Sequence, residues 1–209
     1  MSKTKLEYKT FRRYFQNEFK ERSSRFICFG IPVKSKDEAI LEIDKIKSRY
    51  FGAKHYVYAF SLCDGYRKFC GDGEPRGSAG EPVAKIIKSY ELKNALVVIV
   101  RYFGGTLLGI GGVVKAYTRG AQMAVDGCGL KILRLCIICN TKFDYSFLKK
   151  FSNVLSFFKA KILSVVYSEC VKSNFCCYKL DFDKLEEKLF ESSSGNFNFS
   201  ISGEDYFEV

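Results

Sequence analysis

The sequence predicts an α+β protein made of two domains. Apolar runs of strand length alternate with amphipathic stretches of helical spacing along the 209 residues. Fifteen of the 17 glycines precede residue 130, and the excess of positive charge ends at the same point. These two breaks place the domain boundary near Gly129, with one domain over residues 1–129 and the other over residues 130–209.

In the first domain, apolar and β-branched runs predict strands that alternate with helices. Ser35 and Glu38 form a capping box that should open a helix. Two glycine-rich loops, residues 70–82 and 104–112, each precede a further amphipathic stretch, and Gly129 should end the last helix. The expected strands are 25–33, 56–62 and 95–100, the last one buried on both faces.

In the second domain, the patterns follow the order βαββαβ. A helix is expected over residues 147–158, and a second capping box at Asp183 and Glu186 should open another. This order is typical of the ferredoxin-like fold. The expected strands are 133–145, 161–167, 171–182 and 197–201.

The composition favours a cytoplasmic globular protein. Hydrophobic residues make up 47% of the chain and charged residues 27%. The longest apolar run, residues 95–100, is far shorter than the roughly 18 residues that a membrane helix needs. Residues 1–19 contain no apolar core of a secretory signal, so the nine cysteines are expected to be reduced thiols.

No metal or cofactor is expected. Cys136 and Cys139 have the spacing of metal ligands, but on a strand their side chains would point to opposite faces. His55 is the only histidine, and no cysteine lies near it in the sequence. Buried core cysteines therefore fit this pattern better than zinc does.

The charge is concentrated in the first part of the chain. Residues 1–130 hold 23 basic and 13 acidic residues, whereas residues 131–209 hold 11 and 10. The excess could serve solubility alone. A one-sided excess more often indicates an anionic partner, of which nucleic acid is the commonest.

The first glycine loop carries two carboxylates, Asp72 and Glu74. They could serve acid–base chemistry or hold a cation, or they could cap helices and pair with Arg76 in a rigid turn. The rigid turn is favoured, because no histidine or thiol is close in the sequence. Ser78 does not stand in a nucleophile elbow, so no catalytic residue is predicted.

The second glycine loop has the features of an anion site. A glycine loop before a helix offers free backbone N–H groups and the positive end of the helix dipole. Lys115 and Arg119 share one face near the start of that helix, where cations oppose the dipole unless an anion lies in front of them. An internal carboxylate and an external phosphate both fit this pattern, although the Walker A and dinucleotide motifs are absent.

The two loops are expected to meet in one polar cleft, because each precedes a helix that packs on the same sheet. Arg101, at the end of a buried strand, should pair there with Asp72 or Glu74. The residues expected at this anion or phosphate site are Asp72, Glu74, Arg101, Tyr102, Gly104, Gly105, Gly111, Gly112, Lys115 and Arg119, with His55, Arg76 and Ser78 as further candidates.

Four ordered motifs resemble the IMPACT family, in particular its bacterial YigZ-type branch. The sequence departs from the usual pattern at Gly71, where an acidic residue is common, and at Thr118 and Arg119, where small residues are usual. The motifs are Lys20–Phe26, Lys54–Ala59, Asp72–Pro82 and Val100–Tyr117.

The resemblance implies that the first domain has the fold of ribosomal protein S5 domain 2, shared with a domain of elongation factor G. It implies a ferredoxin-like second domain that is similar to another domain of that factor. Eukaryotic relatives restrain the kinase that phosphorylates initiation factor 2, by competing for its activator protein with the help of a further N-terminal domain. The resemblance implies no defined activity for the bacterial branch of the family.

Three functions are consistent with the sequence. The leading one is a non-enzymatic protein that binds RNA or the ribosome and acts in translation or its regulation. An enzyme acting on a phosphorylated small molecule is the alternative, because sugar kinases share the S5-like fold, although their serine-rich loop is missing here. The third is a protein-interaction adaptor, favoured by the nearly neutral second domain.

Overall fold

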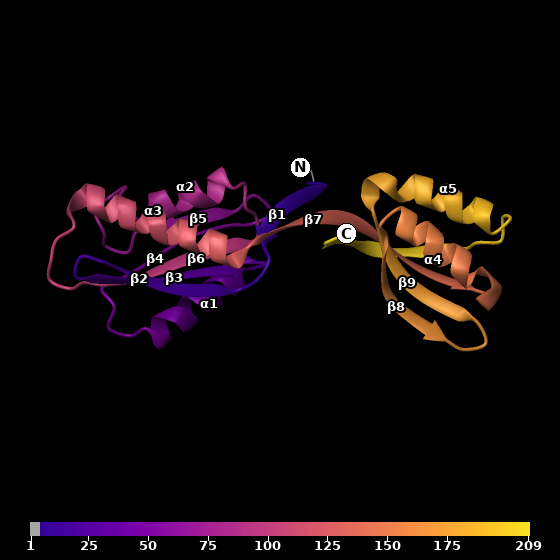
Figure 1. The fold of residues 1–209 in the computed structure, drawn as a ribbon, viewed down its shortest axis with the longest axis horizontal. Helices are drawn as coiled ribbons and strands as arrows, with labels where there is room; N and C mark the ends of the chain where they lie inside the picture. The colour runs from indigo at the N-terminus through magenta and orange to yellow at the C-terminus, as the bar shows by residue number, and fades with distance from the viewer. Residues whose placement is uncertain (1–4) are drawn as a thin grey trace. The chain divides into compact units, whose positions relative to one another are not determined.

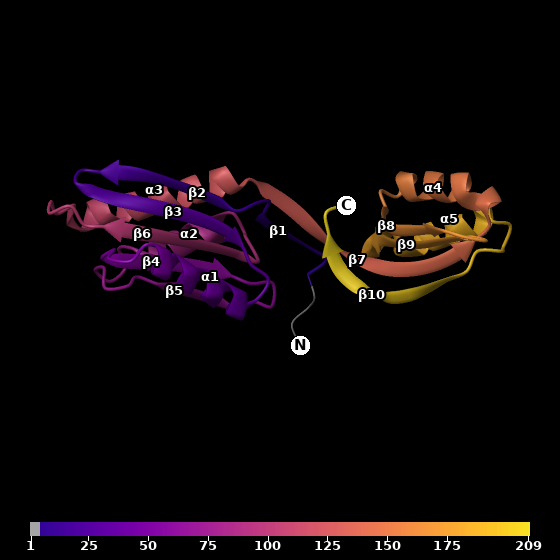
Figure 2. The same cartoon turned by 90° about the horizontal axis from the view of Figure 1, so that it is seen from below.

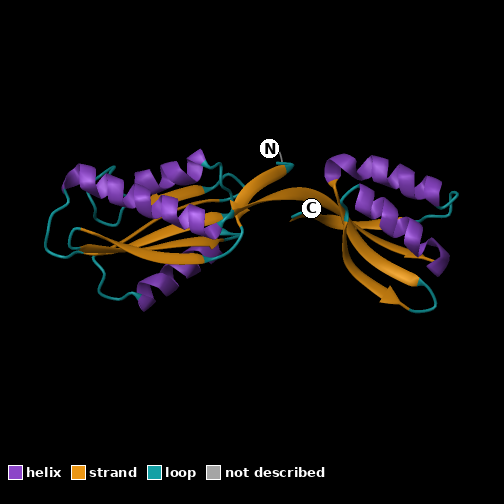
Figure 3. Cartoon of the chain, viewed as in Figure 1, coloured by secondary structure: helices purple, strands orange, loops and turns teal. Residues whose placement is uncertain are grey.

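The structure, a computed structural model, describes residues 5–209. The chain divides into two compact units, and each contains an antiparallel sheet with helices packed on it (Figures 1 and 3). Of the described residues, 8–132 form the first unit, and 5–7 with 133–209 form the second. The protein is therefore an α+β protein with two domains.

The elements up to residue 128 make up the first unit, and all of their strands except β1 form one sheet. In chain order they are β1 (Glu7–Phe11), β2 (Phe15–Glu21), β3 (Ser24–Pro32), α1 (Lys36–Arg49), β4 (His55–Ser61), β5 (Arg67–Cys70), α2 (Gly80–Ser89), β6 (Ala95–Tyr102) and α3 (Gly109–Cys128).

Helices cover both faces of the sheet in the first unit, whose strand order is β2-β3-β6-β4-β5 (Figures 1 and 2). Side chains that alternate along β3 and β6 enter two separate cores, one beneath α2 and α3 and the other beneath α1. Cys28 and Ile99 belong to the first core, and Ile27 and Val98 to the second. All residues from 95 to 100 are fully buried, which confirms the predicted doubly buried strand.

The predicted capping box at Ser35 is present at the start of α1. The Ser35 side chain accepts a hydrogen bond from the backbone N–H of Glu38, and the Glu38 carboxylate accepts one from the backbone N–H of Lys34. The sequence analysis missed β1, β2 and β5. The last two are edge strands with mostly polar, exposed side chains, so they lack the apolar runs that predicted the other strands.

The second unit has the predicted order βαββαβ, with two short 3-10 helices inserted. Its sheet has five strands, in the order β1-β7-β9-β8 with β10 also paired with β7. The β10–β7, β7–β9 and β9–β8 pairs are antiparallel. The elements are β7 (Leu130–Phe143), η1 (Tyr145–Phe147), α4 (Leu148–Phe157), β8 (Lys161–Tyr167), β9 (Val171–Tyr178), η2 (Lys179–Asp181), α5 (Phe182–Ser192) and β10 (Phe199–Phe207).

The capping box expected at Asp183 is wrong. The helix α5 begins at Phe182, directly after η2, so Asp183 lies within its first turn. The N-cap is Asp181, and its side chain makes no capping hydrogen bond. The 3-10 turn at Lys179–Asp181 continues directly into the helix, as such turns often do at helix ends.

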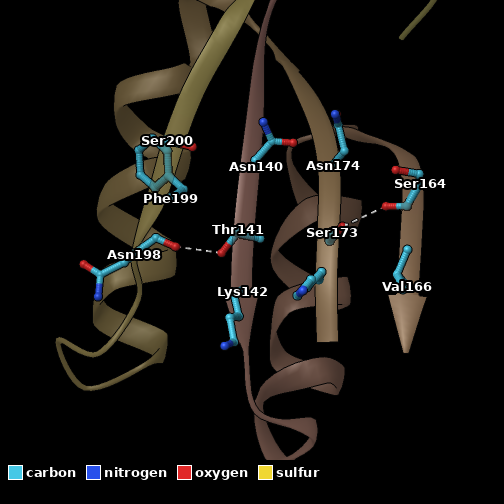
Figure 4. A pocket seen from close by; sticks show the side chains of 11 residues that line it. Asn140, Thr141, Lys142, Ser164, Val166, Ser173, Asn174, Asn198, Phe199 and Ser200 are labelled. Carbon is cyan, nitrogen blue, oxygen red and sulfur yellow. Dashed lines mark hydrogen bonds between the residues drawn. The ribbon is translucent and has the colours of Figure 1, made fainter. Parts of the chain in front are cut away.

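Helices α4 and α5 cover one face of the second sheet and leave the other face open (Figure 2). The open face carries a shallow groove of about 670 Å³, lined by strands β7, β8, β9 and β10 (Figure 4). Thr141 Oγ1 donates to the Asn198 carbonyl at 2.7 Å, and Ser173 Oγ donates to the Ser164 carbonyl at 3.4 Å. Within residues 5–209, no helix is long and apolar enough to cross a membrane.

Candidate ligand-binding site

A buried carboxylate lies at the centre of the first glycine loop. The Glu74 side chain is 3% exposed, and its Oε1 accepts hydrogen bonds from Arg101 Nη1 at 2.5 Å and from the Tyr117 hydroxyl at 2.8 Å. These partners come from the end of β6 and from α3. The prediction that Arg101 pairs with Asp72 or Glu74 is therefore confirmed, with Glu74 as the partner.

The surroundings of Arg101 hold its guanidinium group in place. Its Nη2 donates to the Ser24 hydroxyl at 3.3 Å, and its plane lies over the Phe26 ring, 5.4 Å from the centroid. Burial of an ion pair costs desolvation energy. The hydrogen bonds to Ser24 and from Tyr117, and the contact with the Phe26 ring, help to offset that cost.

The protonation state of Tyr117 follows from its surroundings. Burial, and then the neighbouring Glu74 carboxylate, raise the pKa of Tyr117 far above its usual value. Tyr117 therefore stays protonated and remains a donor.

Asp72 and His55 complete this cluster. The Asp72 carboxylate accepts the backbone N–H of Tyr56 at 2.7 Å, and the Asp72 carbonyl lies 2.6 Å from His55 Nδ1. A carbonyl can only accept, so Nδ1 carries the proton and Nε2 faces Glu74 Oε1 at 3.7 Å. Both carboxylates of the loop are thus engaged by groups of the protein itself.

The second glycine loop is tied to the turn between β2 and β3. A Cβ atom on Gly104 would lie 1.7 Å from the carbonyl oxygen of Ser23, so only glycine allows this approach. Arg22 donates to the carbonyl of Leu107 at 2.9 Å, and the hydroxyls of Ser23 and Thr106 share a hydrogen bond of 2.9 Å. The loop therefore has a defined shape without a ligand.

The helix that follows this loop begins without a side-chain cap. Its N-cap is Leu108, and its first turn contains no acidic residue. Gly105 and Gly109 have φ of +90° and +70°, a region that favours glycine. Gly111 and Gly112 lie in the first turn, and nothing within 4 Å would obstruct a Cβ on Gly111. The start of α3 is open to an acceptor from outside.

Lys115 and Arg119 differ in their surroundings. Lys115 is exposed, and no carboxylate of the described chain pairs with it. Arg119 lies 3.5 Å from the Glu21 carboxylate and 4.6 Å from the centroid of the Phe19 ring, so the protein already supplies its partners. Glu74 does not neutralise Lys115, because its Oε1 is occupied by Arg101 and Tyr117.

Three other candidate residues have separate roles. The buried Ser78 hydroxyl donates to the Pro75 carbonyl at 2.6 Å, so it is not an accessible nucleophile. Tyr102 donates to the Tyr50 carbonyl at 3.0 Å and is thereby held at the end of α1. Arg76 is exposed and pairs with neither Asp72 nor Glu74.

The first loop surrounds a cavity of about 390 Å³, lined by residues between 69 and 81. Asp72, Glu74 and Arg76 are among them, whereas the second loop contributes none. Helices α2 and α3 do lie side by side on one face of the sheet (Figure 1). The Glu74–Tyr117 hydrogen bond joins the first loop to helix α3, and the cavity is lined by the first loop and its flanking residues, without the second loop.

Sequence reasoning did not select Tyr117 and Ser24 as members of this cluster. Tyr117 fits the apolar stripe of α3, where only its hydroxyl indicates a second role. Within residues 5–209, no group of three or more histidine, cysteine, aspartate or glutamate side chains is arranged to hold a metal ion. Cys136 and Cys139 are both buried in β7, and Cys139 belongs to the core beneath α4 and α5.

Known proteins resemble this chain over both units. The Impact N-terminal domain family matches residues 22–125. The IMPACT family member YvyE of Bacillus subtilis is 30% identical over 203 residues, which cover 96% of this chain and 94% of YvyE. The IMPACT family member YigZ of Escherichia coli is 32% identical over 108 residues, about half of each chain.

A solved structure matches at the level of the fold. It is a crystal structure of a hypothetical protein with a TM-score of 0.63 and 23% identity, covering 93% of this chain and 97% of that one. The sequence matches, taken with the two-unit α+β architecture, define the class of protein. The chain belongs to the IMPACT family.

Proposed function

We propose that this protein binds RNA, free or in the ribosome, through its first unit, and that it acts in the cytoplasm in translation or its regulation. The observation that carries the proposal is Lys115, an exposed cation near the uncapped start of α3. The carboxylates that could neutralise it internally are engaged elsewhere, Glu74 by Arg101 and Asp72 by the Tyr56 N–H. A phosphate group would satisfy both the lysine and the helix start.

The charge distribution supports the same proposal. Residues 1–130 have ten more basic than acidic residues, so the electrostatic attraction to phosphates should come almost wholly from the first unit. Arg76 adds an exposed cation on the neighbouring loop. Binding of this kind relies on phosphates and should show little sequence preference.

The proposed fold relationships point in the same direction. We propose that the first unit has the fold of ribosomal protein S5 domain 2 and that the second is ferredoxin-like, each similar to a domain of elongation factor G. The strand order β10-β7-β9-β8, with βαββαβ along the chain, supports the second relationship. The helices on both faces of the first sheet are compatible with the first one.

The test is a salt titration of binding to a labelled single-stranded RNA. Changing Lys115 and Arg119 to alanine together should lower the slope of log K against log salt by about 0.7, the contribution of one single-strand phosphate contact. Lys115 supplies that contact, because Arg119 is already paired with Glu21. The matched control is Lys184→Ala with Lys188→Ala, which removes two cations at the same spacing from α5. An unchanged slope in the first variant, or an equal loss in the control, would contradict the proposal.

A second candidate is an enzyme that acts on a phosphorylated small molecule. The cavity of about 390 Å³ beside Asp72 and Glu74 favours it, because the His55 imidazole lies 3.7 Å from the Glu74 carboxylate. A thermal-shift screen with nucleotides and sugar phosphates tests this candidate. A shift abolished by Arg76→Ala would support it, and a chain that binds neither RNA nor these compounds would favour the protein-interaction adaptor.

A further inference from the structure

β8 is an edge strand of the second sheet. In the order β10-β7-β9-β8 it hydrogen-bonds to β9 on one side, and no described strand pairs with its other side. An edge strand presents a row of backbone N–H and C=O groups that can pair with another chain. Whether it does so depends on how its side chains protect it.

The side chains of β8 give it little protection. The six residues from Ile162 to Tyr167 contain no charge, and Lys161 is the only charged residue of the strand. Ile162, Leu163, Val166 and Tyr167 are large, exposed apolar side chains, and Val166 is 57% exposed. The strand shifts register against β9 at Leu163 but pairs regularly from Ser164 to Tyr167.

The other edge strands show the protection that β8 lacks. β2 carries Glu18, Lys20 and Glu21 along seven residues, and β5 has four residues that include two cations. β10 has a register shift near Gly203, followed by two carboxylates. Charges and short length discourage pairing between edges. β8 has neither along Ser164–Tyr167, where its pairing with β9 is regular.

We propose that β8 pairs with β8 of a second copy of this chain, antiparallel and about a two-fold axis. With Val165 on the axis, Leu163 of one copy lies opposite Tyr167 of the other. The same register sets Lys161 opposite Glu169, a residue just beyond the strand, at both ends of the pair. Apolar side chains thus meet in the middle and opposite charges meet at the ends, as a self-complementary interface requires. A parallel pairing would instead set Lys161 beside Lys161.

This pairing would also extend the open face of the sheet. Ser164 and Val166 of β8 line the groove on that face, beside β9 (Figure 4). Two paired sheets would join their grooves into one continuous floor. One strand pair buries less surface than a standard stable interface, so the dimer should be weak and dependent on concentration.

Sedimentation velocity of the full chain, from about 5 to about 500 µM, tests the proposal. The weight-average mass should rise from the monomer value of 23.9 kDa toward twice that value. Val166→Lys should raise the dissociation constant at least tenfold, by placing a charge in the middle of the interface. The matched control is Ile201→Lys on β10, where the replaced side chain is 58% exposed, and it should leave the constant unchanged.

A charge swap tests the orientation of the strands. Lys161→Glu should weaken the dimer severalfold, because it sets two carboxylates opposite each other at each end, and adding Glu169→Lys should restore it. A chain that stays monomeric at the highest concentration overturns the proposal. So does a dimer that Val166→Lys leaves intact, or one that the double swap fails to restore.

Discussion

The two sheets of this protein differ in how they are covered. Helices lie on both faces of the first sheet, so β6 is apolar at every position from 95 to 100. The second sheet has helices on one face, and in β9 buried residues alternate with more exposed ones from 171 to 175, although Cys176 and Cys177 are both buried. The comparison shows that the apolar pattern of a single central strand indicates whether helices cover one face of its sheet or both.

The two units also differ in how deeply their ion pairs are buried. The first unit buries an ion pair between Arg101 and Glu74, with side chains that are 5% and 3% exposed. The ion pairs found among the described residues of the second unit all join exposed side chains, as in Lys179–Glu204. Exposed pairs contribute little to stability, whereas loss of one partner of a buried pair is costly.

The largest effect is therefore expected for Arg101→Met, which leaves Glu74 buried without its cation. We expect a loss of about 3 to 5 kcal/mol in the free energy of unfolding of the first unit. The second unit should be unaffected. Hydrogen exchange followed by mass spectrometry separates the two units by their peptides.

A control for that variant is Lys179→Met, which removes one partner of an exposed pair and should cost under about 1 kcal/mol. Adding Glu74→Leu to Arg101→Met should recover part of the loss, because no buried charge is then left alone. Equal effects of the Arg101 and Lys179 variants would show that burial does not distinguish the two pairs.

An intermediate effect is expected at alkaline pH, through buried thiols. Burial raises the pKa of Cys177 in the second core to about 12, as it does that of Cys28 in the first unit. Below about pH 8.5 the thiol is protonated in the folded and in the unfolded chain. Above that pH only the unfolded chain releases the proton, because burial holds the pKa of the folded chain's thiol higher. Each such thiol should lower stability by about 2 kcal/mol between pH 8 and pH 10.

Denaturant unfolding in the presence of a reductant measures this dependence at the two pH values. Cys177→Ala should lose less stability than the wild type on going from pH 8 to pH 10, and Cys28→Ala should do the same for the first unit. If each variant shows the same pH dependence as the wild type, the thiols are not the cause.

The smallest effect compares two helix starts. Ser35→Ala removes the side-chain acceptor at the start of α1 and should cost about 1 kcal/mol. Asp181→Ala at the start of α5 removes no capping hydrogen bond and should cost less than about 0.5 kcal/mol. Thermal unfolding of the two variants checks the difference, and a larger loss for Asp181→Ala would reverse it.

The sequence predicted those parts of the fold that strong local patterns specify. The strand at 161–167 matches β8 from end to end, and the order βαββαβ follows from apolar periods of two and of about 3.6 residues. The edge strands β2 and β5 gave no such signal, because their stability comes from neighbouring strands. The start of α5 was misplaced because the strand predicted over 171–182 ends at Tyr178, and the 3-10 turn Lys179–Asp181 takes up residues that read as a continuation of the strand.

For the candidate site, the sequence predicted which kinds of charged group would pair better than it predicted which residues would pair. The pairing of Arg101 with a loop carboxylate followed from its place at the end of a buried strand. The choice of Glu74 over Asp72, and the part of Tyr117, depend on how α3 packs across the sheet. A ligand role for Lys115, Arg119 and the glycines stays a prediction.

The contacts at Gly104 have a consequence for the energetics of recognition. The second glycine loop is held by Arg22 and Ser23 before any ligand arrives. A flexible loop must lose conformational entropy when a ligand orders it, and that loss weakens binding. The second glycine loop loses most of its conformational entropy when the protein folds. Binding of a ligand should therefore need no slow closure of the loop. Variants that loosen Gly104 should reduce affinity mainly through the entropy of binding.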